Sequence, residues 1–420
     1  MCFRFPLTLV ALMLLSLVQQ STYAADLPTV VPEQVGLSAE RLALVRPAIQ
    51  TVVDEGRVPG AVVMVCRRGK VALVEAVGWR DIENEKPMER DTVFRIYSMT
   101  KPITSVAVLM LVERGQIDLD APVERYLPEL ADRKVLSAVT GELEPARRAI
   151  TTRDLLRHTS GMTYGFYGKS TVDQQYLRTR VLNPERPLSE MLIKLRDLPL
   201  VSQPGERFEY SVSVDVLGRL VEVVSEKRFD EFLATNLFEP LGMNDTGFHV
   251  AEGALSRFAN NYAVSEQGKL RILDRADKSH YRHPLALLSG GGGLVSTADD
   301  YMRFCQMLLA HGEFEGKRYL RPETVLVMTS NQLMGGAYPI SISGDVRHGV
   351  GFGLGVSVIC EKIPGAGYVP LGEYGWGGAA STHFWISPKD DLAVVALTQV
   401  MPFSLRLEGV VKPLVYAAIE

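Results

Sequence analysis

Residues 93–102 have the sequence Val-Phe-Arg-Ile-Tyr-Ser-Met-Thr-Lys-Pro, and this junction between a strand-like run and a helix decides the fold. An apolar pattern with helical spacing begins after Ser98 and ends near Arg114-Gly115, a basic residue followed by a glycine stop. Ser98 and Lys101 therefore share one face at the start of a helix. A buried lysine with a lowered pKa can take the proton of a serine hydroxyl. We interpret Ser98 as a candidate nucleophile and Lys101 as its activating group; a capping serine followed by a solvated lysine is the alternative.

Strand-like runs occur toward both ends of the chain, and mainly helical patterns lie between them. The runs cover residues 60–65, 71–77, 92–96, 352–359, 382–386 and 392–398. Amphipathic helices are predicted from Leu37, capped by Ser38, and from about Leu405 onward. This order predicts an α+β fold: a mostly antiparallel sheet built from both ends of the chain, flanked by terminal helices, with an inserted, mainly helical lobe.

The same order predicts one catalytic domain over residues 25–420. We expect residues 25–97 and 290–420 to form an α/β lobe, and residues 98–289 to form the mainly helical lobe.

The first 24 residues have the features of a secretory signal peptide. Arg4 gives a positive start, Phe5 to Val18 is nearly all apolar, and Ala24 ends a stretch of small residues at a cleavage site. An uncleaved anchor is the alternative, but the apolar run is shorter than the roughly 20 residues that span a bilayer. We therefore expect a secreted or periplasmic protein with no stable membrane span after cleavage.

The composition limits the classes of partner. Of 420 residues, 46% are hydrophobic and 22% are charged, which is enough apolar mass for a large core. A formal net charge of −4 gives no reason to expect a nucleic-acid partner. Outside the leader, Cys66, Cys305 and Cys360 lack metal-ligand spacing, so we expect small core residues rather than a disulfide framework. The oxidation state of any pair and the oligomeric state are left open.

Further motifs follow Ser98 in a fixed order along the chain. They are Tyr97-Ser98-Met99-Thr100-Lys101-Pro102, Leu155-Leu156-Arg157-His158-Thr159-Ser160-Gly161-Met162, Phe208-Glu209-Tyr210-Ser211, Pro240-Leu241-Gly242-Met243 and Gly290-Gly291-Gly292-Gly293-Leu294. Together they resemble the β-lactamase-like serine hydrolases, which include class C β-lactamases, DD-peptidases and the family VIII carboxylesterases. The resemblance covers essentially all of the chain after the leader.

The resemblance implies that Tyr210 is the second activating group, which moves protons between Ser98, the leaving group and the deacylating water. Its pKa, ordinarily near 10, is then expected to be lowered by the ammonium group of Lys101. Whether Lys101 or Tyr210 is the formal base stays open at this point.

A third motif, Trp376-Gly377-Gly378-Ala379, departs from the lactamase and peptidase pattern, in which a cation and a hydroxyl bind a substrate carboxylate. An indole and a glycine supply no such anchor. Val212 likewise replaces the family's asparagine. Both departures, with the segment Asp215-Val216-Leu217-Gly218, resemble the esterase branch. The same resemblance implies an oxyanion hole made by the backbone N–H groups of Ser98 and Ala379, with Gly377 and Gly378 permitting close backbone approach.

These features predict hydrolysis of a small carboxylic ester through a Ser98 acyl-enzyme, with no metal or organic cofactor. Activity as a β-lactamase, D-amino-acid peptidase or acyltransferase with the same site is the enzymatic alternative. A penicillin-binding cell-wall sensor is the non-catalytic one. No Gly-x-Ser-x-Gly occurs, so an α/β-hydrolase elbow is not supported.

Several other motifs receive plainer interpretations. His280 and His283 have a metal-like spacing without a third ligand nearby, so we expect a loop there. Residues 290–293 lack the lysine of a phosphate loop, and we expect close packing beside the site. His158 is interpreted as structural. An aromatic group is compatible with either a substrate pocket or a lobe core; it consists of Tyr164, Phe166, Tyr167 and Tyr176.

Overall fold

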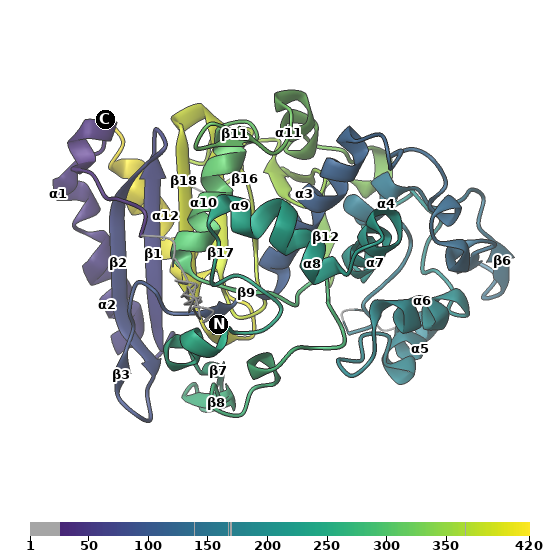
Figure 1. Ribbon diagram of the computed structural model, residues 1–420, viewed down its shortest axis with the longest axis horizontal. Coiled ribbons are helices and arrows are strands. Elements are labelled where there is room, and N and C mark those ends of the chain that lie inside the picture. The colour runs from purple at the N-terminus through teal and green to yellow at the C-terminus, as the bar shows by residue number, and fades with distance from the viewer. Residues whose placement is uncertain (1–25, 138, 167, 169, 366) are drawn as a thin grey trace, which may run out of the picture.

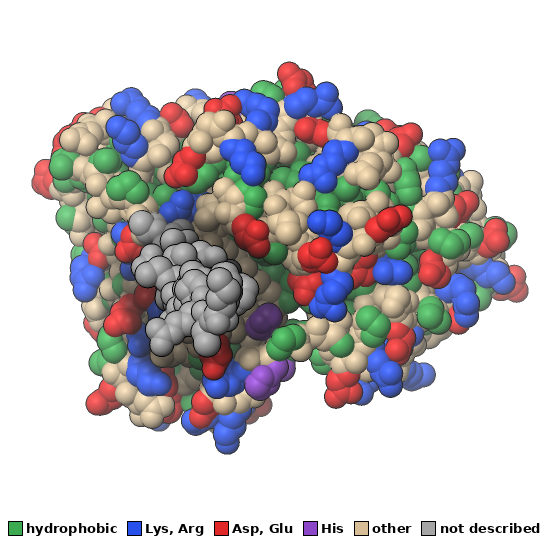
Figure 2. Space-filling model, in the orientation of Figure 1, with side chains coloured by type: hydrophobic (Ala, Val, Ile, Leu, Met, Phe, Trp, Pro, Cys, Tyr) green, Lys and Arg blue, Asp and Glu red, His purple; other side chains and the backbone are tan. Residues whose placement is uncertain are grey.

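The computed structural model describes residues 26–420 except 138, 167, 169 and 366. The predicted signal peptide therefore lies outside the described residues. On the face shown in Figure 2, basic and acidic side chains are interspersed rather than gathered into one patch. None of the helices in the described ranges has both the length and the apolar character needed to cross a bilayer.

An antiparallel sheet of eight strands forms one side of the molecule (Figure 1). Its strands, in spatial order, are β14 (Val350–Phe352), β15 (Ser357–Ile359), β16 (Tyr374–Gly377), β17 (His383–Ser387), β18 (Leu392–Thr398), β1 (Gly60–Arg67), β2 (Lys70–Asp81) and β3 (Lys86–Pro87). The two ends of the chain meet where β1 pairs with β18, with Val63 opposite Ala396. Both strands are buried along their whole length, because helices cover both faces of the sheet.

Terminal helices cover one face of the sheet and an internal helix covers the other. Helices α2 (Val45–Asp54) and α12 (Arg406–Ala417) pack against each other, and they share a hydrophobic core with the sheet. Helix α10 (Ala298–Leu309) packs against β1 and β18. The predicted fold class, a mostly antiparallel sheet with flanking terminal helices and a helical lobe, is confirmed.

Seven further helices of the described residues follow one another along the middle of the chain. They are α3 (Thr100–Glu113), α4 (Thr152–Leu156), α5 (Thr171–Thr179), α6 (Leu188–Arg196), α7 (Ser213–Ser225), α8 (Phe229–Leu233) and α9 (Glu239–Leu241). In Figure 1, α4 to α7 lie at the end away from α2, whereas α9 lies beside α10. Helix α3 packs along α7, and nearly all of α3 is buried. A helix that is apolar on every side needs neighbours all round, and α3 has them because it lies between the sheet and the helical lobe.

Short strands lie outside the main sheet. Two occur in the hairpin β5 (Lys134–Leu136) and β6 (Leu143–Pro145), and β7 (Asn261–Val264) joins β8 (Leu270–Asp274) and β19 (Val400–Met401). Smaller pairs are β10 (Glu313–Phe314) with β11 (Lys317–Arg318) and β12 (Ser341–Ile342) with β13 (Asp345–Val346). Residues 98–289 thus contain the short strands β5 to β8 as well as helices. Helices α1 (Ala39–Leu42) and α11 (Pro322–Met328) complete the α-helices of the described residues.

Three expected elements differ in detail. The run at 92–96 supplies β4 (Phe94–Arg95), which pairs with β9 (Val295–Ser296) instead of joining the main sheet. The run at 352–359 is the β14–β15 hairpin, because Gly355 has φ of 96° and turns the chain. The helix from Leu37 is capped by Ser38 as predicted but breaks into α1 and α2 at residues 43–44.

Cys66 and Cys305 are buried in the core, as predicted, and Cys360 is half-buried. All three thiols are free. Burial raises the pKa of the Cys66 thiol to about 12, so this cysteine is a poor nucleophile.

Candidate active site

Ser98 lies at the junction between the sheet side and the helical lobe. The turn Tyr97–Met99 joins β4 to α3, and Tyr97 has φ of 42°, a left-handed conformation that a tyrosine rarely adopts. Asn261 donates to the Tyr97 hydroxyl at 3.2 Å, which ties the strained residue down. Half-buried Ser98 therefore sits on a sharp, fixed turn directly before a buried helix.

Two predicted partners reach the Ser98 hydroxyl. The Tyr210 hydroxyl donates to Ser98 Oγ at 2.7 Å, and Lys101 Nζ donates to the same oxygen at 3.1 Å. Lys101 lies in the first turn of α3 and Tyr210 lies just before α7, so the packing of α3 on α7 brings the three residues together.

Lys101 is fully buried, and its surroundings favour the neutral amine. Burial lowers the pKa of Lys101 to about 7, and the nearby Asp215 carboxylate opposes this shift. Lys101 Nζ also donates to the Gly291 carbonyl at 2.6 Å. A Cβ atom at Gly291 would lie 2.5 Å from Asp215 Oδ2 and 2.7 Å from the Tyr164 hydroxyl. The glycine run therefore packs closely beside the site, as its composition predicted.

Tyr210 differs from the expectation in one respect. The resemblance led us to expect a pKa lowered by the Lys101 ammonium, but burial raises the pKa of Tyr210 above its ordinary value. Two physical reasons explain the difference. Tyr210 as a whole residue is only 8% exposed, which disfavours the phenolate, and burial lowers the pKa of Lys101 to about 7, so its ammonium is partly lost near neutral pH. Tyr210 thus holds its proton at rest.

The Trp376 motif forms the wall next to Tyr210. Trp376 lies in β16, and its Nε1 donates to the Tyr210 hydroxyl at 3.4 Å. Its ring packs edge-on against Phe352, with centroids 5.1 Å apart. The indole thus supplies a hydrogen bond to the site in addition to the apolar area predicted from sequence.

Gly378 lies against the segment that leads into Ser98. A Cβ at Gly378 would lie 2.2 Å from the Ile96 carbonyl oxygen and 2.3 Å from Thr382 Oγ1, so no larger residue fits. Strand β16, which ends one residue before Gly378, also contacts the turn that carries Ser98. Among the backbone hydrogen bonds that the described residues make outside their helices and strands, none uses the N–H of Ser98 or Ala379.

Asp215 is the site residue that sequence reasoning missed. Its segment supplied a family match, but no role was predicted for the carboxylate. The residue is fully buried in α7 and accepts hydrogen bonds from the Ser289 hydroxyl and, at 3.1 Å, from the Gly291 N–H. Burial raises the pKa of Asp215, and Lys101 opposes the rise. The signal that could have found it is an acidic residue inside an otherwise apolar helical run.

His158 packs behind Tyr210, with ring centroids 4.8 Å apart. Its Nδ1 accepts the Ser211 N–H at 3.3 Å, and burial lowers the pKa of His158 well below its usual value. A neutral, buried ring in this position supports Tyr210 rather than acting as a cation.

The aromatic group divides between site and core. Tyr164 stacks on Phe166 at 5.0 Å and lies 5.3 Å from the Tyr210 ring, so these residues border the site. Tyr176 is 2% exposed and belongs to the lobe core. Tyr167 lies outside the described residues.

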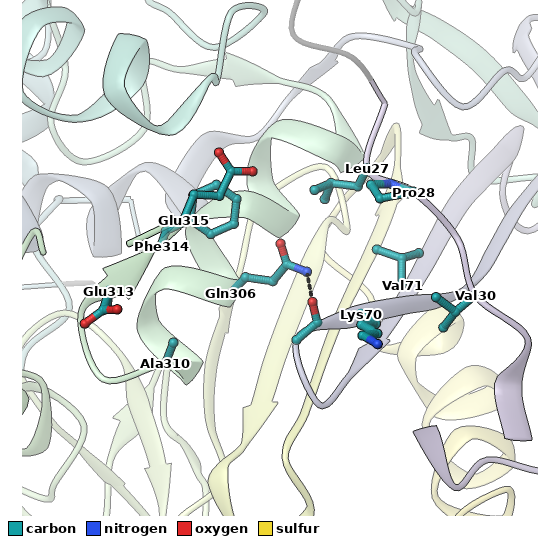
Figure 3. Close-up of a pocket in the computed structure, with 11 residues that line it drawn as sticks. Leu27, Pro28, Val30, Lys70, Val71, Gln306, Ala310, Glu313, Phe314 and Glu315 are labelled. Atoms are coloured by element: carbon teal, nitrogen blue, oxygen red, sulfur yellow. Dashed lines mark hydrogen bonds between the residues drawn. The ribbon is translucent and has the colours of Figure 1, made fainter. Parts of the chain in front are cut away.

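The His280–His283 segment and the cavity beside α10 do not contribute to this site. His280 begins the short turn His280–Arg282, and the described part of the chain holds no cluster of three or more residues suited to a metal. A cavity of about 590 Å³ lies between α10 and the β1–β2 turn, where Gln306 donates to the Gly69 carbonyl at 3.0 Å (Figure 3). Its lining residues include none of Ser98, Lys101 and Tyr210.

Comparison with known proteins identifies the family. Residues 45–409 match the model of the Beta-lactamase family, so the chain belongs to that family and is a serine hydrolase of its fold. The family predicted from the motifs is therefore confirmed, as is the prediction of an enzyme.

Particular relatives cover most of the chain. Protein Rv1367c of Mycobacterium tuberculosis is 40% identical over 84% of this chain and 89% of its own length. Esterase EstB of Burkholderia gladioli is 32% identical over 92% of this chain and 96% of its own. The solved structure of EstCE1, described as a hydrolase with promiscuous acyltransferase activity, has a TM-score of 0.78 at 28% identity, covering 90% of this chain and 99% of EstCE1.

Proposed function

We propose that this protein is a carboxylesterase that hydrolyses small esters through an acyl-enzyme on Ser98. The observation that carries the proposal is the pair of hydrogen bonds on Ser98 Oγ, one from Tyr210 and one from Lys101. A nucleophile with two proton-transfer groups in direct contact is the arrangement that acyl transfer requires. The similarity to an esterase along nearly the whole chain supports the choice of ester as substrate.

In the first step Lys101 accepts the Ser98 proton while Oγ attacks the acyl carbonyl. A pKa of about 7 makes the neutral amine available at physiological pH. The N–H groups of Ser98 and Ala379 stabilise the oxyanion. Tyr210, which keeps its proton because burial raises its pKa, protonates the leaving alkoxide, and the Lys101 ammonium then returns a proton to Tyr210. Ser98 is left acylated and the alcohol departs.

In the second step water attacks the acyl carbon. A proton of the water passes to the neutral Lys101 amine, the bond between the acyl carbon and Ser98 Oγ breaks, and Oγ recovers a proton from Lys101. The free acid is released and the original site is restored. Every role in this scheme is filled by a protein group, and the proposal needs no metal or organic cofactor.

Acyl transfer to an alcohol is a second candidate, because it uses the same acyl-enzyme with an alcohol in place of water. The acyltransferase activity in the description of EstCE1 favours including it. We also propose that the protein acts outside the cytoplasm, on the basis of the leader at residues 1–24.

The test is steady-state turnover of p-nitrophenyl butyrate and of a chromogenic cephalosporin by the purified chain lacking its leader. Ser98→Ala is compared with Ser105→Ala, which removes a buried hydroxyl of the same helix that has no hydrogen-bond partner in the described part of the chain. Ester turnover that is lost only in Ser98→Ala supports the proposal. Faster turnover of the cephalosporin than of the ester, or equal activity in Ser98→Ala, overturns it.

A further inference from the structure

A second cavity adjoins the predicted oxyanion strand. It has a volume of about 580 Å³, and its lining includes Trp376 and Gly377 of β16 together with Arg347. Trp376 contacts Tyr210, so the cavity begins one residue away from the reacting groups. A substrate group that extends past Gly377 would enter it.

Arg347 projects from a fixed part of the backbone. The residue follows the β12–β13 hairpin, its N–H donates to the Ile340 carbonyl at 2.9 Å, and its carbonyl accepts from the Val350 N–H at 3.0 Å. The side chain is half-buried. Its positive charge acts on the Tyr210 hydroxyl and opposes the rise in pKa that burial causes there, so the guanidinium lies within electrostatic range of the reaction centre.

The charges around the cavity leave Arg347 uncompensated. Other charged or titratable residues line the same cavity. Lys412 pairs with both Glu373 and Glu408 at 2.7 Å, and His383 also contacts Glu408. These groups satisfy one another. In the described part of the chain no ion pair or side-chain hydrogen bond is assigned to the Arg347 guanidinium, and Asp345 two residues before it is exposed. Its five N–H donors match the two oxygens of a carboxylate.

We propose that Arg347 binds a carboxylate of the substrate, so that the preferred substrates are anionic esters whose charged end lies in the cavity beside Trp376 and Gly377. The cation that β-lactamases and peptidases place on this strand is thus supplied from the neighbouring hairpin. The proposal rests on the esterase function proposed above, and it makes Arg347 a specificity-determining residue.

Two matched substrate pairs test the proposal and distinguish the source of the carboxylate. The p-nitrophenyl monoester of adipic acid against p-nitrophenyl hexanoate places the charge on the acyl side. The acetyl ester of 4-hydroxybenzoate against phenyl acetate places it on the alcohol side. Wild type, Arg347→Ala and Arg347→Lys are compared, with Arg125→Ala as a control that removes the same charge from an exposed position in the turn Val123–Arg125.

We expect Arg347→Ala to lower kcat/KM for the anionic ester of at least one pair by about tenfold or more, mainly through KM, and to lower it much less for the neutral ester, so that the anionic-to-neutral ratio falls. Arg347→Lys should recover part of the loss, and Arg125→Ala should show none. An unchanged anionic-to-neutral ratio in both pairs overturns the role of Arg347 and leaves the esterase proposal standing. Absence of Ser98-dependent turnover of all four esters overturns both.

Discussion

A single residue, Gly291, connects the buried carboxylate of Asp215 to the buried amine of Lys101. The Gly291 N–H donates to Asp215 Oδ1 at 3.1 Å, and the Gly291 carbonyl accepts from Lys101 Nζ at 2.6 Å. The two peptide groups that flank Gly291 thus each make one of these hydrogen bonds, and together they fix the position of Lys101 beside Ser98. Burial of the amine and the charge of the carboxylate act in opposite directions on the Lys101 pKa, which gives the site a defined pH response.

Esterase activity should fall as the pH is lowered through about 7. The pKa of Lys101 is lowered to about 7, and only the neutral amine can accept the Ser98 proton. Activity is therefore present above this pH and is lost as the ammonium forms. A profile of kcat/KM for p-nitrophenyl butyrate between pH 5 and 9 checks this, because kcat/KM reports the free enzyme. A profile that declines with rising pH through 7 would instead assign the ammonium form to the active enzyme.

Replacing the buried carboxylate should move that profile. The Asp215 charge raises the Lys101 pKa, so Asp215→Asn should shift the midpoint of the acid limb to lower pH, while the amide oxygen can still accept the Gly291 N–H. Ser289→Ala is the matched control, since it removes a hydrogen bond from Asp215 and leaves the charge in place. The measurement is the same pH profile for each variant. Equal midpoints in wild type and Asp215→Asn contradict an electrostatic role for Asp215.

The Trp376 indole is expected to support the chemical step through Tyr210. Phenylalanine at position 376 keeps a ring beside Phe352 and removes the N–H that reaches the Tyr210 hydroxyl. One neutral hydrogen bond contributes about 0.5–1.5 kcal/mol, so kcat should fall about two- to tenfold with KM little changed. Steady-state kinetics with a neutral ester separates the two constants, and thermal unfolding checks that packing is kept. A raised KM with unchanged kcat would show that the indole acts on the substrate instead.

Local spacing predicted that Ser98 and Lys101 lie on one face, although the motif alone left a capping serine as the alternative. The two residues are three positions apart, so their contact depends only on the turn Tyr97–Met99 and the start of α3. Tyr210 is 112 residues from Ser98, and only the resemblance to a family singled it out. Strands β1, β2 and β18 were predictable because their apolar runs are long and bounded by turns.

The remaining features depend on distances that the sequence does not contain. Asp215 contacts a peptide 76 residues further along, and nothing in its own helix indicates that partner. Arg347 follows a short hairpin with no distinctive pattern. The sign of the Tyr210 pKa shift was predicted wrongly because burial and a nearby cation compete, and the depth of burial is a tertiary property.

Export can be tested on the chain itself. When the full sequence is produced in a bacterium with a secretion pathway, the protein recovered from the periplasm or the medium should begin at Ala25, following cleavage after Ala24. N-terminal sequencing and intact mass check this. Retention of residues 1–24 in a membrane fraction would favour the uncleaved anchor.

Lys412 is expected to contribute strongly to stability, because it is the cation shared by two carboxylates beneath the second cavity. Its side chain is 15% exposed and those of Glu373 and Glu408 are 3% and 22% exposed, so water compensates little if the cation is removed. Lys412→Met keeps most of the aliphatic stem, but it removes the ammonium that lies 4.8 Å from the centre of the Trp385 ring and takes the shared cation from both carboxylates, so it should lower the free energy of unfolding by about 3 kcal/mol. As a control, Lys86→Met breaks the ion pair with Asp81, in which the lysine side chain is 51% exposed, and should lower the free energy of unfolding by less than about 1 kcal/mol.

Urea denaturation of both variants measures the difference in the free energy of unfolding. Adding Glu373→Gln to Lys412→Met should restore part of the loss, because it removes one of the two carboxylate charges that Lys412 neutralised. Equal effects of the two lysine substitutions would mean that water stabilises the charges of Glu373 and Glu408 without Lys412, and would contradict the prediction.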